Sequence, residues 1–182
     1  MNRPDSPSIA LLIIDMINDF NFDNGDMLLQ HTKAIMKPII ELKRYMKENG
    51  YPIIYINDHY KLWQADYNKI IETCKNERNA NLIERIKPEQ DEFFLIKPKH
   101  SAFYGTALNT LLHQLHVKRL ILTGIAGNIC VLFTANDAYM REYELWVPED
   151  CIASASKDDN YYALTMMNHV LKASTKKSSL DF

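Results

Sequence analysis

The sequence predicts a single α/β domain of three layers (α/β/α), in which helices cover both faces of a mainly parallel, Rossmann-like sheet. Short apolar runs rich in β-branched residues, typical of buried strands, alternate with segments in which apolar residues recur every three to four positions, typical of helices. Such alternation favours right-handed crossovers between parallel strands. A chain of 182 residues without an internal repeat suits one domain, which we expect to span residues 1–182.

Each predicted element follows from a local pattern. We expect strands over residues 9–14, 52–57, 93–96, 120–122 and 145–147, with a short sixth strand over residues 151–153. We expect helices over residues 31–49, 106–116, 128–140 and 159–171. The first helix ends at Asn49 and Gly50, because glycine tolerates the left-handed conformation of a helix cap. Residues 58–90 are polar with scattered aromatic residues and predict a helical excursion, whereas the Ser/Lys-rich tail at 174–179 is expected to be frayed or lightly docked.

Composition and charge exclude several kinds of partner. The formal net charge is −2, which gives no general affinity for nucleic acid or for an anionic membrane. The first apolar run, "IALLII", is too short to cross a bilayer, and no signal peptide pattern is visible, so we expect a cytoplasmic protein. Three cysteines without close pairs predict neither a disulfide framework nor a zinc site. Cys74 and Cys151 have no predicted activating neighbour and are interpreted as structural.

Three reactive side chains follow predicted strands. Asp15 ends the first strand in "LLIIDMINDF", Lys97 ends the third, and Cys130 lies just past the fourth in "LTGIAGNICV". Each has an ordinary explanation on its own: a turn residue, a solvated charge and a small core residue. In a parallel sheet, however, all three positions lie at the same edge, where ligands gather. Together they predict a catalytic site.

The chemistry of the three groups is complementary. A helix N-terminus and a nearby ammonium such as Lys97 favour the thiolate form of a cysteine. A carboxylate such as Asp15 can accept the thiol proton and return it to a leaving amine. Gly124 and Gly127 permit a tight turn, in which backbone N–H groups approach a substrate carbonyl. Cys130 is therefore the expected nucleophile.

With these motifs the chain resembles the isochorismatase-like cysteine hydrolases, a family that includes nicotinamidases and enzymes related to N-carbamoylsarcosine amidase. The resemblance runs from about residue 10 to residue 171 and is carried by "LLIIDMINDF", "IKPKHSAFYGTAL" and "LTGIAGNICVLFTANDAY". It implies a hydrolase acting on C–N bonds other than peptide bonds, which cleaves a small amide or carbamoyl substrate through a thioester. It also implies a homo-oligomer, a dimer or larger, and the apolar segment "CVLFTANDAYM" agrees with association.

The resemblance also assigns roles to individual residues. It makes Asp15, Lys97 and Cys130 the catalytic triad, and it places a non-proline cis peptide at Ile125–Ala126. The N–H groups of Ala126 and Cys130 would then form the oxyanion hole. The sequence departs from the family at Gly127, where Thr or Ser is common, and after Asp15, where Gln often stands two residues on. Neither departure touches the triad.

Other residues are candidates for the wall of the substrate site. Asn18 and Phe20 follow Asp15 closely, although capping and core packing explain them equally well. An apolar rim is expected from aromatic side chains that simple packing also explains: Tyr60, Trp63, Tyr104 and Phe133.

We expect no cofactor and no metal ion. Nicotinamidases of the resembled family bind a divalent ion through an Asp-x-His motif after the second strand, together with further histidines. Here that strand ends in "YINDHY", so Asn57 stands in the place of the motif aspartate, and asparagine is a poor ligand for a transition metal. Asp58 and His59 are adjacent and point to opposite sides of an extended segment, and His100 is the only nearby candidate for a third ligand.

Two other functions remain open from the sequence. One is an isochorismatase-type ether hydrolase in which Cys130 is incidental, since isochorismatase proper lacks the nucleophilic cysteine. The other is a non-enzymatic module that binds a small ligand, such as a receiver-like phosphoacceptor. A receiver requires an aspartate at the end of the third strand, where this chain has Lys97.

Overall fold

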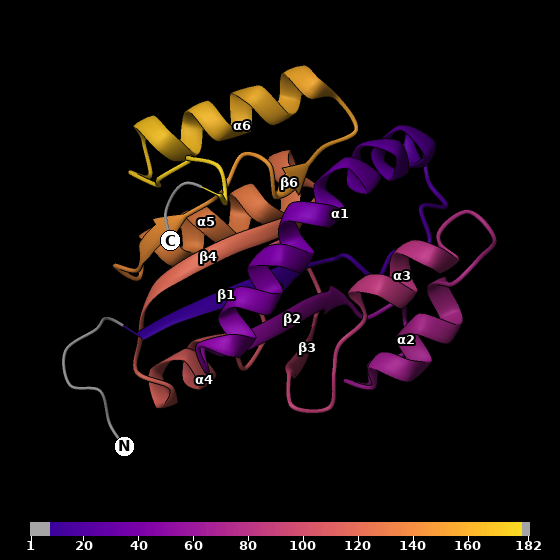
Figure 1. Ribbon diagram of the computed structural model, residues 1–182, viewed down its shortest axis with the longest axis horizontal. Helices are drawn as coiled ribbons and strands as arrows, with labels where there is room; N and C mark the ends of the chain where they lie inside the picture. Colours follow the sequence, from indigo (N-terminus) through magenta and orange to yellow (C-terminus); the bar gives the residue numbers. More distant parts are fainter. Residues whose placement is uncertain (1–7, 180–182) are drawn as a thin grey trace.

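A computed structural model describes residues 8–179, and its centre is a six-stranded parallel sheet (Figure 1). The strands are β1 (Ser8–Ile14), β2 (Ile53–Asp58), β3 (Phe93–Lys97), β4 (Val117–Ile125), β5 (Glu144–Trp146) and β6 (Ile152–Ala153). Their order is β3-β2-β1-β4-β5, and the short β6 pairs with the far end of β4. Strand order therefore reverses between β1 and β4, the place where open parallel sheets bind ligands.

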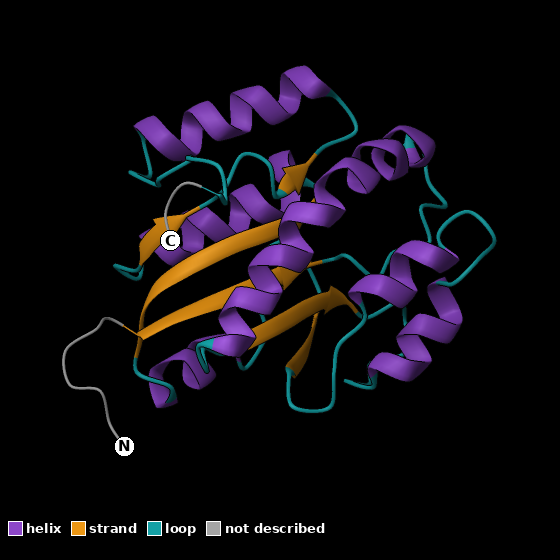
Figure 2. Cartoon of the chain, viewed as in Figure 1, coloured by secondary structure: helices purple, strands orange, loops and turns teal. Residues whose placement is uncertain are grey.

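Helices cover both faces of this sheet, which confirms the predicted three-layer fold (Figure 2). One face packs against α1 (Gly25–Glu48) with α2 (Tyr67–Cys74) and α3 (Ala80–Ile86), and the other against α4 (Leu108–Gln114), α5 (Leu132–Tyr139) and α6 (Lys157–His169). Strand β1 is apolar throughout because both of its faces are buried. Leu11 and Ile13 enter the first core, whereas Leu12 and Ile14 enter the second.

Most element boundaries lie within a few residues of those expected, but α1 begins six residues earlier, at Gly25 instead of residue 31. Its additional turns bury Leu28 and Leu29, whose apolar stripe continues that of the rest of the helix. The expected helix over residues 128–140 is divided, because a π-helical turn at Gly127–Val131 precedes α5. That turn contains Cys130.

Two segments that the sequence left loosely defined have a definite structure. Residues 58–90 contain α2 and α3, as the expected helical excursion. The C-terminal tail is docked beside β5, because the amide of Val147 donates to the carbonyl of Ser174 at 2.8 Å and the hydroxyl of Ser178 donates to Asp150 at 3.0 Å. Within residues 8–179, no helix is long and apolar enough to span a membrane.

Gly124 places β4 in unusually close contact with the end of β1. Its φ of 110° is unfavourable for any residue with a side chain, and a Cβ atom here would lie 2.1 Å from the carbonyl oxygen of Ile14. Glycine at this position therefore allows the end of β4 to lie directly beside the end of β1, where Asp15 follows.

Candidate active site

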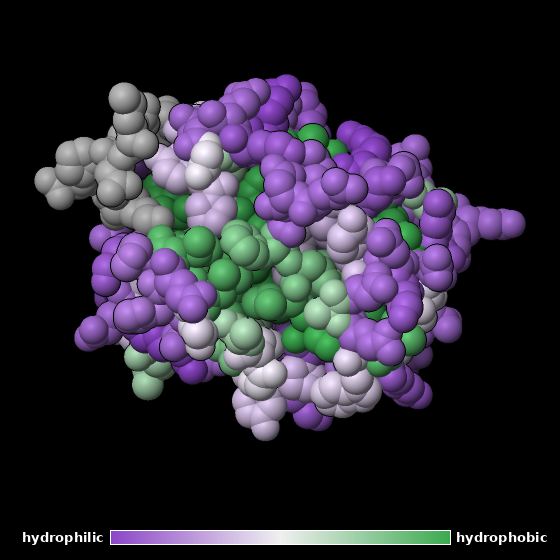
Figure 3. All heavy atoms as spheres, turned by 90° about the horizontal axis from the view of Figure 1, so that it is seen from below, coloured by the Kyte–Doolittle hydropathy of each residue, from purple (hydrophilic) through white to green (hydrophobic). Residues whose placement is uncertain are grey.

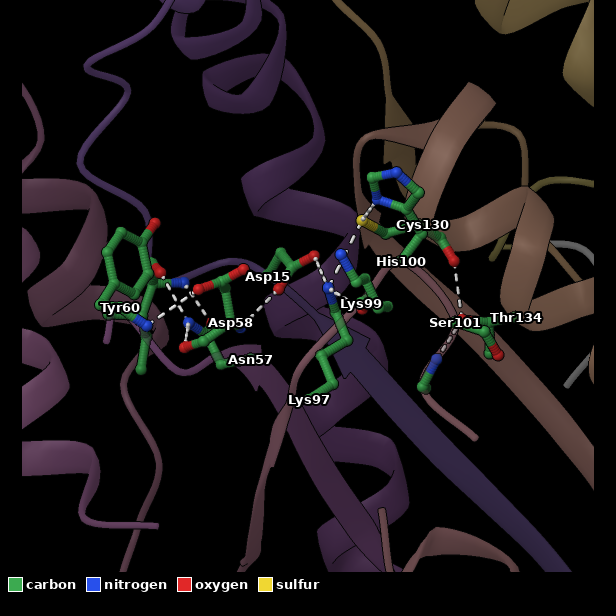
Figure 4. A network of polar contacts seen from close by, with 12 residues as sticks. Asp15, Asn57, Asp58, Tyr60, Lys97, Lys99, His100, Ser101, Cys130 and Thr134 are labelled. Atoms are coloured by element: carbon green, nitrogen blue, oxygen red, sulfur yellow. Dashed lines mark hydrogen bonds and ion pairs between the residues drawn. The ribbon is translucent and has the colours of Figure 1, made fainter. Parts of the chain in front are cut away.

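Three side chains from separate strands meet at the carboxyl edge of the sheet (Figure 4). The ammonium of Lys97 lies 2.8 Å from Oδ2 of Asp15 and 3.5 Å from Sγ of Cys130. Asp15 follows β1, Lys97 ends β3, and Cys130 follows β4. The sequence predicted that these residues would meet, and the structure brings them together at the point where strand order reverses.

Asp15 is held in place from two sides. It is 6% exposed and has a φ of 52°, a left-handed conformation that few residues other than glycine adopt. Its Oδ1 accepts a hydrogen bond of 2.8 Å from the amide of Asp58. Next to it, Asn57 donates to the carbonyl of Ile17 at 2.9 Å and accepts from the amide of Ile17 at 3.2 Å. The segment after β1 is thus fastened to the end of β2.

Lys97 is a buried cation with three partners. Its side chain is 2% exposed, and its ammonium also donates to the carbonyl of Lys99 at 3.1 Å. Burial acts to lower the pKa of this ammonium, but the carboxylate of Asp15 and the sulfur of Cys130 outweigh burial and raise the pKa above its usual value. Lys97 therefore stays charged and paired with Asp15.

The surroundings of Cys130 favour the protonated thiol, whereas its position after a strand predicts a stabilised thiolate. Burial and the carboxylate of Asp15 raise its pKa to about 12, although Lys97 acts in the opposite direction. The main cause is burial, and the positive charge of Lys97 offsets it only in part because Asp15, at 2.8 Å, already balances that charge. Attack by this sulfur on a substrate would then require a base, and the carboxylate of Asp15 lies in the same cluster.

The turn that carries Cys130 is braced by neighbouring hydroxyl groups. Thr134 is fully buried; its hydroxyl donates to the carbonyl of Cys130 at 2.6 Å and accepts from the amide of Ala102 at 3.0 Å. The hydroxyl of Ser154 accepts from the amide of Asn128 at 3.0 Å and donates to Asn160. These contacts fix Cys130 relative to both β6 and the loop that follows Lys97.

Gly127 is explained by the same contacts. A Cβ atom at this position would lie 2.4 Å from Oδ1 of Asn160 and 3.1 Å from Oγ of Ser154. The space that a Thr or Ser would fill is therefore occupied, and Ser154 supplies a hydroxyl beside the turn.

The expected oxyanion turn has the backbone form that the resemblance implied. The peptide bond between Ile125 and Ala126 is cis. Two amides of the turn, those of Ile129 and Val131, both donate to the carbonyl of Ala126, at 3.0 and 3.2 Å. The N–H groups of Ala126 and Cys130 remain the proposed donors to a substrate oxygen.

His100 is a site residue that the sequence interpretation missed. Its Nδ1 lies 4.0 Å from Sγ of Cys130, and its ring packs against Phe133 with centroids 5.6 Å apart. We considered this histidine only as a metal ligand without a reason to turn inward. The sequence signal for its role is its position three residues after Lys97. The structure holds this loop close to the site because the ammonium of Lys97 donates to the carbonyl of Lys99.

The candidate wall residues fall into three groups. Phe20 is 1% exposed in the first core, and the side chain of Asn18 accepts from the amide of Phe20 at 2.7 Å, so both have evident structural roles. Tyr60 lies beyond Asp58, on the side of Asp15 away from Cys130 (Figure 4). The remaining aromatic side chains are largely exposed and available to a ligand: Trp63 at 66%, Tyr104 at 62% and Phe133 at 52%.

The residues in place of the nicotinamidase metal motif do not fit a metal ion. Both polar atoms of Asn57 are bonded to Ile17. Asp58 accepts from the amide of Tyr60 at 2.8 Å, and Nδ1 of His59 accepts from the amide of Lys61 at 3.0 Å while its ring stacks on Trp63. Within the described part of the chain, no group of three or more His, Cys, Asp or Glu side chains could hold an ion.

Known proteins resemble this chain in both sequence and fold. It is 60% identical over 164 residues to the isochorismatase family protein YaaI of Bacillus subtilis, covering 90% of this chain and 91% of that one. Among solved structures, N-carbamoylsarcosine amidase from Thermoplasma acidophilum superimposes with a TM-score of 0.72 at 27% identity, covering 94% of this chain and 96% of the other. The pyrazinamidase/nicotinamidase of Streptococcus mutans gives a TM-score of 0.71 at 28% identity, covering 92% and 99%. The model of the isochorismatase domain matches residues 9–177, and the chain therefore belongs to the isochorismatase family.

Proposed function

We propose that this protein is a cysteine hydrolase that cleaves a small amide or carbamoyl compound through a thioester on Cys130. The observation that carries the proposal is the buried contact of Asp15, Lys97 and Cys130, in which one ammonium touches both the carboxylate and the sulfur. A carboxylate beside a nucleophile and a cation held between them supply the base, the nucleophile and the charge balance that acyl transfer needs.

The first half of the reaction forms the thioester. Asp15 takes the thiol proton as Sγ of Cys130 attacks the substrate carbonyl, so an S–C bond forms and negative charge moves to the carbonyl oxygen. The amides of Ala126 and Cys130 would stabilise that oxygen. When the C–N bond breaks, Asp15 returns the proton to the nitrogen, and an amine or ammonia leaves.

The second half reverses these roles. Asp15 removes a proton from a water molecule, whose oxygen attacks the thioester carbonyl. The C–S bond then breaks, and the proton returns to the sulfur of Cys130. Throughout both steps Lys97 stays charged beside Asp15, so that its ammonium balances negative charge on the carboxylate or on the sulfur.

A carbamoyl or ureido substrate fits the site better than nicotinamide. In nicotinamidases of this family the metal holds the pyridine nitrogen, and here Asn57, Asp58 and His59 are bonded to the backbone instead. N-carbamoylsarcosine amidase, one of the similar structures, acts on a carbamoyl compound by its name. The exposed ring of Phe133, packed against the imidazole of His100, offers an apolar surface with one polar group beside the sulfur.

A substrate screen tests this function directly. Small amides and carbamoyl compounds, with nicotinamide among them, are incubated with the protein while ammonia or amine release is followed. Substrates that turn over are then trapped by rapid acid quench, and peptide mass spectrometry locates the acyl group. An adduct on Cys130 supports the proposal; turnover without any adduct on this residue, together with full activity of a Cys130 variant, would refute it.

Turnover is expected to be independent of metal ions. Prolonged treatment with a strong chelator should leave the rate unchanged, because both polar atoms of Asn57, Oδ1 of Asp58 and Nδ1 of His59 are bonded to the backbone. The measurement is the rate before and after chelation, combined with elemental analysis of the active protein. A stoichiometric transition metal, with activity lost on chelation and restored when the ion returns, would contradict this prediction and favour nicotinamide.

Asn57 is expected to act as a positioning residue for Asp15. Asn57→Leu keeps a similar volume but loses the bonds to Ile17, so we expect kcat to fall by about tenfold to hundredfold with little change in KM. The matched control is Asn79→Leu, since Asn79 is also buried and holds the carbonyls of Asn18 and Cys74. Equal losses in the two variants would show that Asn57 serves only stability.

A further inference from the structure

The loop that follows β3, residues 98–107, is basic, whereas the strand before it is apolar. Figure 3 views the molecule from the side of β3 and shows a hydrophobic surface there. In the loop, by contrast, Lys99 and His100 are both exposed. The sequence has no aspartate or glutamate between Glu92 and Asp137, so neither this loop nor the turn of Cys130 contains an acid that would balance these basic side chains.

This loop is held by the rest of the site on either side of His100. Before it, the carbonyl of Lys99 accepts a hydrogen bond of 3.1 Å from the ammonium of Lys97. After it, the amide of Ala102 donates to the hydroxyl of Thr134 at 3.0 Å. The backbone therefore fixes the imidazole in place although the side chain itself is exposed.

The charges of the site are distributed unequally around the sulfur. A row of contacts runs from Asp58 through Asp15, Lys97 and Cys130 to His100 (Figure 4). The acidic side chains stand at one end of this row. At the other end, Nδ1 of the imidazole lies 4.0 Å from Sγ. An anionic group of a substrate is therefore repelled from the first end and attracted to the second.

The acid that α5 contributes near this loop is already balanced. The carboxylate of Asp137 accepts a hydrogen bond from the hydroxyl of Ser101 and is paired with the guanidinium of Arg141 at 3.1 Å. Its charge is therefore largely cancelled by its own neighbours, and the basic character of the loop remains.

We propose that His100, assisted by Lys99, forms a subsite for a carboxylate on the part of the substrate that stays bound to Cys130. This proposal rests on the proposed function, in which Asp15 serves the leaving nitrogen. The leaving nitrogen then lies on the side of Asp15, and the retained part of the substrate lies on the side of His100. The preferred substrate is thus a carbamoyl or amide compound with an acid group close to the scissile carbonyl.

The interactions in this subsite are of two kinds. An N–H of the imidazole donates to the carboxylate, and a hydrogen bond to a charged group is stronger than one between neutral groups. The ammonium of Lys99 adds a longer-range attraction, which solvent weakens because this side chain is exposed. His100 is accordingly a specificity-determining residue, and Asp15 remains the proton carrier.

Two alkylating reagents that differ in charge test the subsite without any turnover. Iodoacetate carries a carboxylate where iodoacetamide carries a neutral amide, and both react with the same thiolate. The ratio of their rate constants is therefore independent of the thiol pKa. At Cys130 this ratio, iodoacetate over iodoacetamide, should exceed the ratio for free N-acetylcysteine by about tenfold or more. Peptide mass spectrometry distinguishes Cys130 from the other two cysteines.

Variants of the loop assign the effect to its residues. His100→Gln should lower the ratio by about fivefold or more, and Lys99→Met by about twofold. The double variant should approach the ratio of N-acetylcysteine. The matched controls are His113→Gln on α4 and Lys61→Met after β2, which remove an exposed histidine and an exposed lysine elsewhere. Both controls should keep the wild-type ratio, and circular dichroism confirms that each variant is folded.

A substrate pair extends the test to turnover. N-carbamoylglycine and its neutral amide differ in the same group, so the wild type should favour the acid in kcat/KM by about tenfold or more, and His100→Gln should raise the KM of the acid alone. A wild-type alkylation ratio no higher than that of N-acetylcysteine, or one that His100→Gln leaves unchanged, would overturn the subsite even if Cys130 is the nucleophile. A high ratio that His100→Gln lowers would support the subsite even if Cys130 forms no thioester.

Discussion

Cys130→Ala should abolish turnover of any substrate that the screen identifies, by at least about a thousandfold, because no other group in the site could form the thioester. Cys130→Ser should be nearly as inactive: the side chain keeps its size, but an alcohol is far harder to deprotonate than a thiol. The assay is release of ammonia or amine under saturating substrate. Binding should survive in both variants, which isothermal calorimetry measures with the same substrate.

The other two cysteines provide the control. Cys74 and Cys151 are 1% and 0% exposed and closed to a substrate, whereas Cys130 is partly exposed and its sulfur contacts the ammonium of Lys97. Cys74→Ala and Cys151→Ala should retain turnover, although a small cavity lowers their stability. Substantial activity in Cys130→Ala, with loss in either control, would place the nucleophile elsewhere.

Much of the fold follows from patterns within short segments. Strands β1 and β2 are continuous apolar runs because their residues alternate between two cores, one on each face of the sheet. Boundaries were less certain where tertiary packing sets them. Helix α1 begins at Gly25 because Leu28 and Leu29 enter the first core and continue the apolar stripe of the helix, which the expected start at residue 31 left out.

The sequence predicts which residues form the candidate site, but it does not predict their protonation. Asp15, Lys97 and Cys130 lie at the carboxyl ends of β1, β3 and β4, and parallel pairing alone brings these ends to one edge. Their protonation depends on distances that the sequence does not contain. A lysine near a cysteine favours the thiolate only if its charge is free, and here Asp15 lies closer to the ammonium, at 2.8 Å, than the sulfur does, at 3.5 Å. The roles of Asn57 and His100 also depend on contacts across the chain.

The ion pair between Asp15 and Lys97 leads to a second large effect. Removal of Asp15 and removal of Lys97 should change the reactivity of Cys130 in opposite directions. The carboxylate raises the pKa of the thiol and the ammonium lowers it. Asp15→Asn leaves Lys97 unpaired beside the sulfur, so the thiol pKa should fall. Lys97→Met removes the cation, so the thiol pKa should rise further. Each unit of change alters the thiolate fraction about tenfold.

Alkylation by iodoacetamide measures the thiolate, and the peptides of Cys74 and Cys151 serve as internal references. With a pKa of about 12, the wild-type thiol should alkylate slowly at pH 7.5, with a rate that rises about tenfold per pH unit up to pH 10. Asp15→Asn should alkylate at least about tenfold faster than wild type at pH 7.5, and Lys97→Met slower. Asp158→Asn, which removes an exposed carboxylate at the start of α6, should match wild type.

Turnover should nevertheless fall by about a hundredfold or more in both triad variants. In Asp15→Asn the sulfur is more often ionised, but the amide can neither take the proton from the nucleophilic water nor give one to the leaving nitrogen. In Lys97→Met the base is present, but the thiol yields its proton with greater difficulty. A variant Asp15→Asn that alkylates more slowly than wild type would mean that the carboxylate stabilises the thiolate. A variant that alkylates faster and also turns over faster would remove Asp15 from the mechanism as the proton carrier.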